Sequence, residues 1–381
     1  MSAIRRISRR HLLMGAGAAV MGAVAYFGLR PFADQVTTTR DSHDSEIVVE
    51  TVVEGLEIPW SISFLNGSEA IVTERPGRVR LLDLSTGRAE LLGTVDVAHV
   101  GEGGLLGCEV LPRGPKLILY RTATVQQRLT NSILLYDDLT LRDHAVLVDN
   151  IEGASVHNGG RVKAGPDGNV YATTGDAARP ELSQRPDSLA GKILRLRPDG
   201  TPPPDNPSPN SLVYSMGHRN PQGIAWSPRR GRLFSTEHGP TGEFGRFAHD
   251  EVNLIVPGGN YGWPHVIGAG RDPRYVDPVL DSGSTTWAPS GCAFYSGTEL
   301  EQFKDSLFFA ALRGEALHRV ALDEEERTVV LHEVLLSGTL GRLRDVAQAP
   351  DGSLYLLTSN RDGRGRPRQG DDRVVAIRNR R

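Results

Sequence analysis

One unit recurs along this chain and limits the folds that it can adopt. The unit is a turn with glycine or a charged pair, followed by a short apolar strand. Its six strands are expected at 70–73, 117–120, 170–173, 233–236, 307–310 and 354–357. The spacing of roughly 45 to 75 residues is within or above the range for propeller blades. Six β units of this size predict an all-β, six-bladed β-propeller, whose radial closure leaves only short protected edges.

The rival fold is a pair of β-sandwiches, which does not require one unit repeated through the whole chain. The 43 glycines and 24 prolines are spread along all 381 residues, which favours many short strands joined by turns. Further strands are expected after several copies of the unit, at 78–82, 192–196 and 317–320. No helical period of useful length follows residue 45.

The N-terminus predicts export. Arg9 and Arg10 precede a moderately apolar run over residues 12–29, which resembles a twin-arginine signal. We therefore expect a signal over residues 1–29, a polar linker over 30–45 and a propeller domain over 46–381. The alternative is an uncleaved membrane anchor, since about 18 apolar residues is near the lower limit for a span. With cleavage, the mature protein has no stable membrane span and works in the periplasm or outside the cell.

The charge of the chain bears on its partners, and its cysteine content bears on disulfide formation. The formal charge is −3, and five arginines with no acids lie in the first thirty residues, so the rest of the chain is more acidic. An acidic body argues against a nucleic-acid partner. The two cysteines, Cys108 and Cys292, are compatible with one disulfide or with two buried thiols.

The stretch 155–176, SVHNGGRVKAGPDGNVYATTGD, is a candidate active-site segment. Gly159 and Gly160 have no side chains, so a flat ligand can lie close to the backbone. His157 stands beside them, and histidine transfers protons near neutral pH. The alternative is a turn histidine that caps a hairpin.

Arginines form a second group of candidates. Arg219 and Asn220 lie in GHRNPQG, an exposed loop by our reading, and this polar density suits an anionic, oxygen-rich ligand. Arg342 and Arg344 alternate, so on a strand they share one face, and with Arg313 they suit a polycarboxylate. The alternative for each of them is a solvated surface residue.

Two further segments combine carboxylates or glycines with turns. EHGP at 237–240, DEVN at 250–253 and NYGWP at 260–264 offer the carboxylate and carbonyl oxygens that calcium prefers, without the His/Cys spacing of a zinc site. A solvated acidic loop is the alternative. EGGLLG at 102–107 lacks the helix and lysine of a phosphate cradle, and indicates either a tight strand start or a loop that lines a ligand.

These motifs, in order, resemble a known family. HNGGR, GPDG, TTGD, GHRNPQG, EHGP, DEVNLI, NYGWP, APSG and GRLRDV, together with GLEIPW and TERPG near the start, are similar to the glucose/sorbosone dehydrogenases. That family includes soluble quinoprotein glucose dehydrogenases and bacterial aldose sugar dehydrogenases. The resemblance covers about residues 50 to 378 and implies a six-bladed propeller that carries pyrroloquinoline quinone (PQQ) with calcium beside it.

The resemblance also implies roles for single residues. His157 matches the general base that takes the proton from the anomeric hydroxyl, and Asp176 would orient it. Arg219 and Asn220 match the pair that contacts the cofactor, with Arg219 also counted among the catalytic residues. The other residues that this likeness places around PQQ are Glu102, Trp287, Arg313, Arg342 and Arg344.

For calcium, the Gly239 and Pro240 carbonyls match the ligands beside the cofactor, and Glu251 and Tyr261 fit a second site of the family. One departure concerns Glu102, where many members carry glutamine in GQGGLLG. A carboxylate there repels an anionic cofactor unless it is protonated or paired with arginine. Arg313 stands where some relatives have lysine, which keeps the charge and changes its geometry.

The expected function is PQQ-dependent oxidation of aldose sugars to lactones, with an external electron acceptor, by a monomer or homodimer. Two alternatives remain open at this point. A calcium-dependent lactonase-type hydrolase would need no quinone, and a secreted propeller that binds glycans or proteins would need no histidine base. Fold alone does not separate the three, because propellers host many activities.

Overall fold

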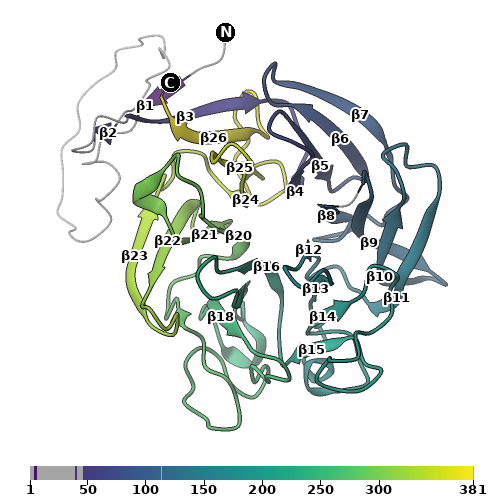
Figure 1. Ribbon diagram of the computed structural model, residues 1–381. Coiled ribbons are helices and arrows are strands. Elements are labelled where there is room, and N and C mark those ends of the chain that lie inside the picture. Colours follow the sequence, from purple (N-terminus) through teal and green to yellow (C-terminus); the bar gives the residue numbers. More distant parts are fainter. Residues whose placement is uncertain (1–3, 7–38, 41–45, 113, 381) are drawn as a thin grey trace, which may run out of the picture.

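The computed structural model describes residues 4–6, 39–40, 46–112 and 114–380, and it is a ring of six β-sheets around a central channel (Figure 1). This confirms the predicted six-bladed propeller. Most of residues 1–45 lies outside the described residues, so the export signal and linker stay predictions. Within the described part of the chain, no helix is both long and apolar enough to cross a membrane.

Each blade is an antiparallel sheet of four main strands, numbered here outward from the channel. Blade 1 contains β4 (Pro59–Phe64), β5 (Glu69–Glu74), β6 (Arg78–Asp83) and β7 (Arg88–Thr94); blade 2 contains β8 (Leu105–Val110), β9 (Leu117–Val125), β10 (Arg128–Tyr136) and β11 (His144–Glu152); blade 3 contains β12 (Val162–Ala164), β13 (Val170–Thr174), β14 (Lys192–Leu196) and β15 (Val213–Met216).

Blades 4 to 6 follow the same order. Blade 4 contains β16 (Pro221–Trp226), β17 (Leu233–Glu237), β18 (Glu251–Ile255) and β19 (Leu280–Asp281); blade 5 contains β20 (Pro289–Phe294), β21 (Leu307–Ala311), β22 (Ala316–Leu322) and β23 (Val329–Leu335); blade 6 contains β24 (Leu343–Gln348), β25 (Leu354–Thr358), β26 (Val374–Asn379) and β3 (Glu46–Val53). The described residues also include three short 3₁₀ helices, at Pro180–Gln184, Glu243–Gly245 and Glu301–Phe303.

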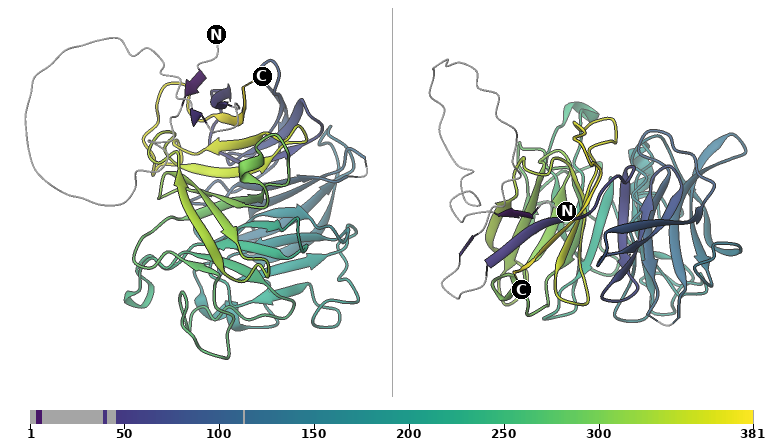
Figure 2. Two further views of the ribbon diagram at one scale, coloured as in Figure 1. Left: turned by 60° about the vertical axis from the view of Figure 1, so that its left-hand side comes forward. Right: turned by 90° about the horizontal axis from the view of Figure 1, so that it is seen from above.

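The ring closes where the first strand of the propeller domain pairs with the last one. β3, from the start of the domain, lies beside β26, from its end (Figure 2). The two strands pair so that Val49 lies opposite Ile377. The short strands β1 (Ile4–Arg6) and β2 (Thr39–Arg40) pair in turn with β3. Because each sheet packs against its neighbours around the ring, this pairing is needed to complete the sixth blade.

The six predicted strands are the second strands of the six blades, β5, β9, β13, β17, β21 and β25. Their apolar runs arise because both faces of these strands are covered by neighbouring blades: every residue of β13, β21 and β25 is buried. Phe308 of β21 is fully buried against Leu354 and Leu356 of blade 6. Truncating such a phenylalanine to alanine costs about 3–5 kcal/mol of folding free energy.

A buried arginine ties the inner strands together in the channel. Arg161, just before β12, donates from Nη1 to Asp345 of β24 at 2.8 Å and to Ser61 of β4 at 2.9 Å. Its Nε donates to the carbonyl of Gln222 on β16 at 2.9 Å, and its guanidinium lies 4.2 Å from the centre of the Trp60 ring. Four blades are therefore joined through one side chain. Cys108 and Cys292 are both buried free thiols, not a disulfide.

Candidate active site

A cavity of about 630 Å³ lies at the end of the channel where the inner strands begin. It is lined by loops that lead into the inner strands and by loops that join the second and third strands of the blades. Eight of the residues singled out from the sequence line it: Glu102, His157, Asp176, Arg219, Asn220, Pro240, Arg313 and Arg342. The cavity therefore brings together motifs that are up to 240 positions apart in the chain.

His157 is held at the cavity wall by its own backbone. It adopts a left-handed conformation with φ of 57°, which is uncommon for a residue with a side chain. Its carbonyl accepts the Ala177 N–H at 3.1 Å and lies so close to Gly175 that a Cβ there would be 1.9 Å from the carbonyl oxygen. The glycine of TTGD is thus required by the close approach of the two loops.

Asp176 fixes the histidine ring. Its buried carboxylate is 2.8 Å from Nδ1 of His157, and it also accepts the indole N–H of Trp263 and the backbone N–H of Ala178, each at 2.8 Å. A carboxylate surrounded by donors acts as an acceptor, so we assign the ring proton to Nδ1. The other nitrogen, Nε2, then carries a free lone pair and lies 3.7 Å from a carboxylate oxygen of Glu243.

The GHRNPQG segment is buried, so the reading of an exposed loop was wrong. Arg219 and Asn220 are 3% and 0% exposed, because the following strand β16 is an inner strand of the ring. Arg219 donates from Nε to Glu243 at 3.1 Å and lies 5.6 Å over the Trp263 ring. Asn220 accepts the Gly159 N–H at 3.0 Å, and its Nδ2 has no partner in the structure.

The three C-terminal arginines occupy different depths. Arg313 is exposed at the cavity rim, while Arg342 donates from Nε and Nη2 to Asp362 at 2.9 and 2.8 Å. Arg344 lies deeper and does not line the cavity; it contacts only neutral oxygens, with Nη1 2.7 Å from Oε1 of Gln222, and its Nε has no partner. Burial lowers the pKa of Arg344 to about 9, and the charges of Asp362 and Glu102 offset this effect only in part.

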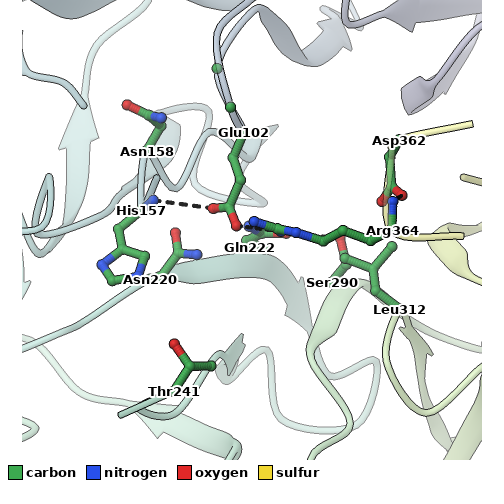
Figure 3. Close-up of polar contacts among 12 residues, drawn as sticks. Glu102, His157, Asn158, Asn220, Gln222, Thr241, Ser290, Leu312, Asp362 and Arg364 are labelled. Atoms are coloured by element: carbon green, nitrogen blue, oxygen red, sulfur yellow. Dashed lines mark hydrogen bonds and ion pairs between the residues drawn. The ribbon is translucent and has the colours of Figure 1, made fainter. Parts of the chain in front are cut away.

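Glu102, between blades 1 and 2, is paired with an arginine from blade 6. Its Oε1 accepts from Arg364 at 2.6 Å and its Oε2 accepts the backbone N–H of His157 at 3.2 Å (Figure 3). Burial opposes ionisation of this carboxyl, but the hydrogen bond from Arg364 and the positive charge of Arg364 lower its pKa to about 2. The carboxylate is therefore charged at neutral pH and matched by a guanidinium.

A second, much smaller cavity adjoins the first. It is lined by all four residues expected to bind calcium: Gly239, Pro240, Glu251 and Tyr261. Glu251 lies opposite Glu237 in the β17–β18 ladder, and burial together with the Glu237 charge raises the pKa of Glu251 to about 8. Two like charges facing each other are unfavourable without a proton or a cation. In the described part of the chain, no group of three or more His, Cys, Asp or Glu side chains is arranged to hold a metal ion.

Trp287 lies beside the cavity but not in its wall. It is buried in blade 5 against Phe309 and His318, with ring centres 5.6 and 5.1 Å away, while its neighbours Thr286 and Ala288 line the cavity. Trp263, which was quoted in NYGWP without a role, is the aromatic residue that contacts both Asp176 and Arg219.

Sequence reasoning missed several cavity residues with polar side chains, among them His238, Thr241, Glu243 and Arg364. His238 was visible in EHGP; burial lowers its pKa to about 3, so its imidazole is neutral, and its Nε2 has no partner. Glu243 and Arg364 lie in long loops without a recurring pattern, and no local signal distinguishes them from surface charges. Their partners, Arg219 and Glu102, become evident only once the ring is closed.

Comparison with known proteins agrees with the fold. A family model described as Glucose / Sorbosone dehydrogenase matches residues 56–366. The fold is similar to a Thermus thermophilus protein described as an oxidoreductase (glucose dehydrogenase), with a TM-score of 0.80 and 47% identity over 87% of this chain and 99% of that one. It is also similar to the PQQ-bound aldose sugar dehydrogenase of Streptomyces coelicolor, with a TM-score of 0.77 and 38% identity over 88% and 98% of the two chains.

Among curated sequences, the aldose sugar dehydrogenase of Escherichia coli is 29% identical, over 83% of this chain and 91% of that protein. The matched region spans five of the six blades completely and reaches into the sixth, including every residue that lines the cavity. The chain therefore belongs to the glucose/sorbosone dehydrogenase family.

Proposed function

We propose that this protein is a PQQ-dependent aldose sugar dehydrogenase that oxidises the anomeric hydroxyl of a sugar to a lactone. The observation that carries the proposal is the His157–Asp176 pair, which faces a cavity whose buried nitrogen donors lack acceptors. The names of two similar proteins, an aldose sugar dehydrogenase and a PQQ-bound one, support the same activity.

His157 is the proposed general base. With the proton on Nδ1 held by Asp176, Nε2 is free to accept the proton of a sugar hydroxyl in the cavity. Glu243, 3.7 Å from Nε2, has an ionised carboxylate. Burial alone would raise its pKa, but the charge of Arg219 and the hydrogen bonds from Arg219 have the larger effect, so the pKa is lowered. When bound, PQQ supplies the two-electron acceptor for the hydride that leaves the anomeric carbon.

The cavity fits an anionic, oxygen-rich cofactor. In the cavity wall, Asn220 Nδ2 is a buried donor without a partner, and an unpaired buried donor costs about 1–3 kcal/mol unless a ligand satisfies it. Arg313, at the cavity rim, has no carboxylate partner in the described residues, so its positive charge is available to cofactor carboxylates. Arg344 adds positive charge from a deeper position. Arg219 and Arg342 would contribute from the two flanks of the same cavity.

Calcium is the proposed metal. The Gly239 and Pro240 carbonyls would hold one ion beside the cofactor, and Glu251 with Tyr261 would hold a second ion; all four residues line the same small cavity. The buried Glu237–Glu251 pair fits a divalent cation, because such an ion neutralises the repulsion of the two carboxylates.

The test is titration of purified apoprotein with PQQ in the presence of calcium, followed by absorbance. We expect stoichiometric uptake and dye-reducing activity with aldoses. Absence of PQQ uptake, or hydrolysis of sugar lactones without quinone, would overturn the proposal. Export through the twin-arginine signal is tested separately, by replacing Arg9 and Arg10 with lysine and measuring retention in the cytoplasm.

A further inference from the structure

Three carboxylates at the cavity end are each matched to one arginine. Glu243 pairs with Arg219, and Asp362 pairs with Arg342 at 2.8 Å. The third pair joins Glu102 to Arg364 at 2.6 Å, across 262 positions of sequence. Among the arginines singled out from the sequence, Arg313 and Arg344 have no carboxylate partner in the described residues. The attraction of the site for an anion therefore depends on the three pairings.

Glu102 cannot move away from the cavity without cost. Its side chain is 20% exposed, and its backbone N–H donates to the Ser155 carbonyl at 2.7 Å. Its Oε2 accepts the N–H of His157, which supports the left-handed backbone of the proposed base (Figure 3). With a pKa of about 2, the carboxyl also does not lose its charge by protonation at neutral pH.

Arg364 is positioned by its own loop. The loop 359–373 joins β25 to β26, and Asp362 within it accepts the backbone N–H of Arg364 through Oδ1 at 2.9 Å. The other oxygen of Asp362 accepts from Arg342. One carboxylate therefore fixes Arg342 and the backbone from which Arg364 reaches Glu102, although the Arg364 side chain is 58% exposed.

We propose that Arg364 determines the affinity of the cavity for its anionic cofactor by compensating the charge of Glu102, without contacting the cofactor itself. This inference rests on the proposed function. Without Arg364, Glu102 leaves an uncompensated negative charge in the wall of a cavity that binds an anion, and like charges at this range repel. Glu102 then has two tasks, support of the His157 backbone and a charge that must be cancelled.

The experiment is a double-substitution cycle on apoprotein with calcium present, read as the Kd for PQQ by equilibrium dialysis. We expect Arg364→Met to weaken binding about three- to tenfold, because repulsion between partly exposed charges is screened. Glu102→Gln keeps an oxygen for the His157 N–H and removes the charge, so binding becomes tighter. The double variant restores a neutral pair and returns the Kd to near the wild-type value.

The matched control is Arg366→Met, which removes the same charge from an exposed position in the same loop outside the cavity wall. Its Kd is expected to stay within twofold of wild type, and the effect of Arg364→Met is expected to shrink at high salt. If Arg364→Met lowers the affinity for PQQ equally in the wild-type and Glu102→Gln backgrounds, Arg364 contacts PQQ directly and the proposal is overturned. The proposal is also overturned if Arg364→Met does not lower the affinity at all. If wild type binds no PQQ, the proposed function itself fails.

Discussion

The inner strands of the ring run between two ends whose loops differ in length and regularity. At the end where these strands finish, here called the turn end, most connections from the first to the second strand of a blade are short, as at 65–68 and 165–169. At the end where they begin, the cavity end, the chain takes longer paths, as at 175–191 and 359–373. The turns that recur in the sequence lie at the turn end, whereas the proposed chemistry lies in the loops that do not recur.

Polar side chains have different hydrogen-bond partners at the two ends. At the turn end they satisfy the local backbone: Asn66 accepts the N–H of Ser68 and Glu69, at 2.8 and 2.9 Å. At the cavity end they contact side chains of other blades, as Glu102 does with Arg364. Regular turns therefore specify the fold within each blade, and the site depends on the blades being assembled correctly.

The largest expected contrast comes from His157→Ala. Loss of the proposed base should lower kcat by about 10²–10⁴-fold while PQQ still binds. Asn66→Ala, the matched change at the turn end, should lower the melting temperature with kcat unchanged. Steady-state kinetics and PQQ titration check both variants, and a His157→Ala protein within tenfold of wild-type kcat would contradict the assignment.

A smaller loss is expected from Asp176→Asn. An amide cannot accept from His157, Trp263 and Ala178 in the way a carboxylate does, so the ring proton is no longer held on Nδ1. We expect kcat to fall by about 10–100-fold with PQQ affinity retained. Asp167→Asn, in a turn-end loop, serves as the control, and an Asp176→Asn variant with full kcat would remove the positioning role.

The effect of calcium on the melting temperature should depend on residues at the cavity end and not on residues at the turn end. Because a ligand that binds only the folded state raises its stability, adding calcium should raise the melting temperature of wild type by several degrees. Glu251→Gln should remove most of this increase, whereas Glu324→Gln, in the exposed turn between β22 and β23, should keep it. Thermal unfolding with and without a chelator measures this, and an unchanged response in Glu251→Gln would place the ion elsewhere.

The smallest effect is expected for Lys163→Met, near the turn end. Lys163 lies 3.2 Å from Glu109; burial alone lowers its pKa, but Glu109 and Asp345 raise it above the ordinary 10.5. The pair therefore contributes fully below pH 10.5 and is lost as the pH rises through the higher folded-state pKa. We expect a loss of about 1 kcal/mol at pH 7 and little difference from wild type well above pH 11, with kcat unchanged. Denaturant unfolding across this range checks it.

The fold could be predicted from the sequence because its signal is local. Each turn such as Pro166-Asp167-Gly168 precedes a strand buried on both faces, and both features are visible within ten residues. The strand β3 was not assigned to a blade, since its partner β26 lies more than 300 residues away. No local pattern indicates such a pairing.

The site could be predicted only in part. His157, Asp176 and Arg219 stand in compact motifs rich in glycine, and the close approach at Gly175 explains why such motifs have small residues. The exposure of GHRNPQG was misjudged because its burial depends on the position of β16 in the ring. Glu243 and Arg364 were missed because their roles are defined by partners on other segments.

The seam between β3 and β26 also sets an order of events during biosynthesis. β3 leaves the ribosome well before β26, and this pairing of distant segments is slow to form. Arg342, Arg344 and Arg364 all belong to blade 6, so one side of the cavity is absent until that blade has been synthesised. We therefore expect a nascent chain without blade 6 to bind the proposed cofactor poorly, so that loading follows synthesis of that blade.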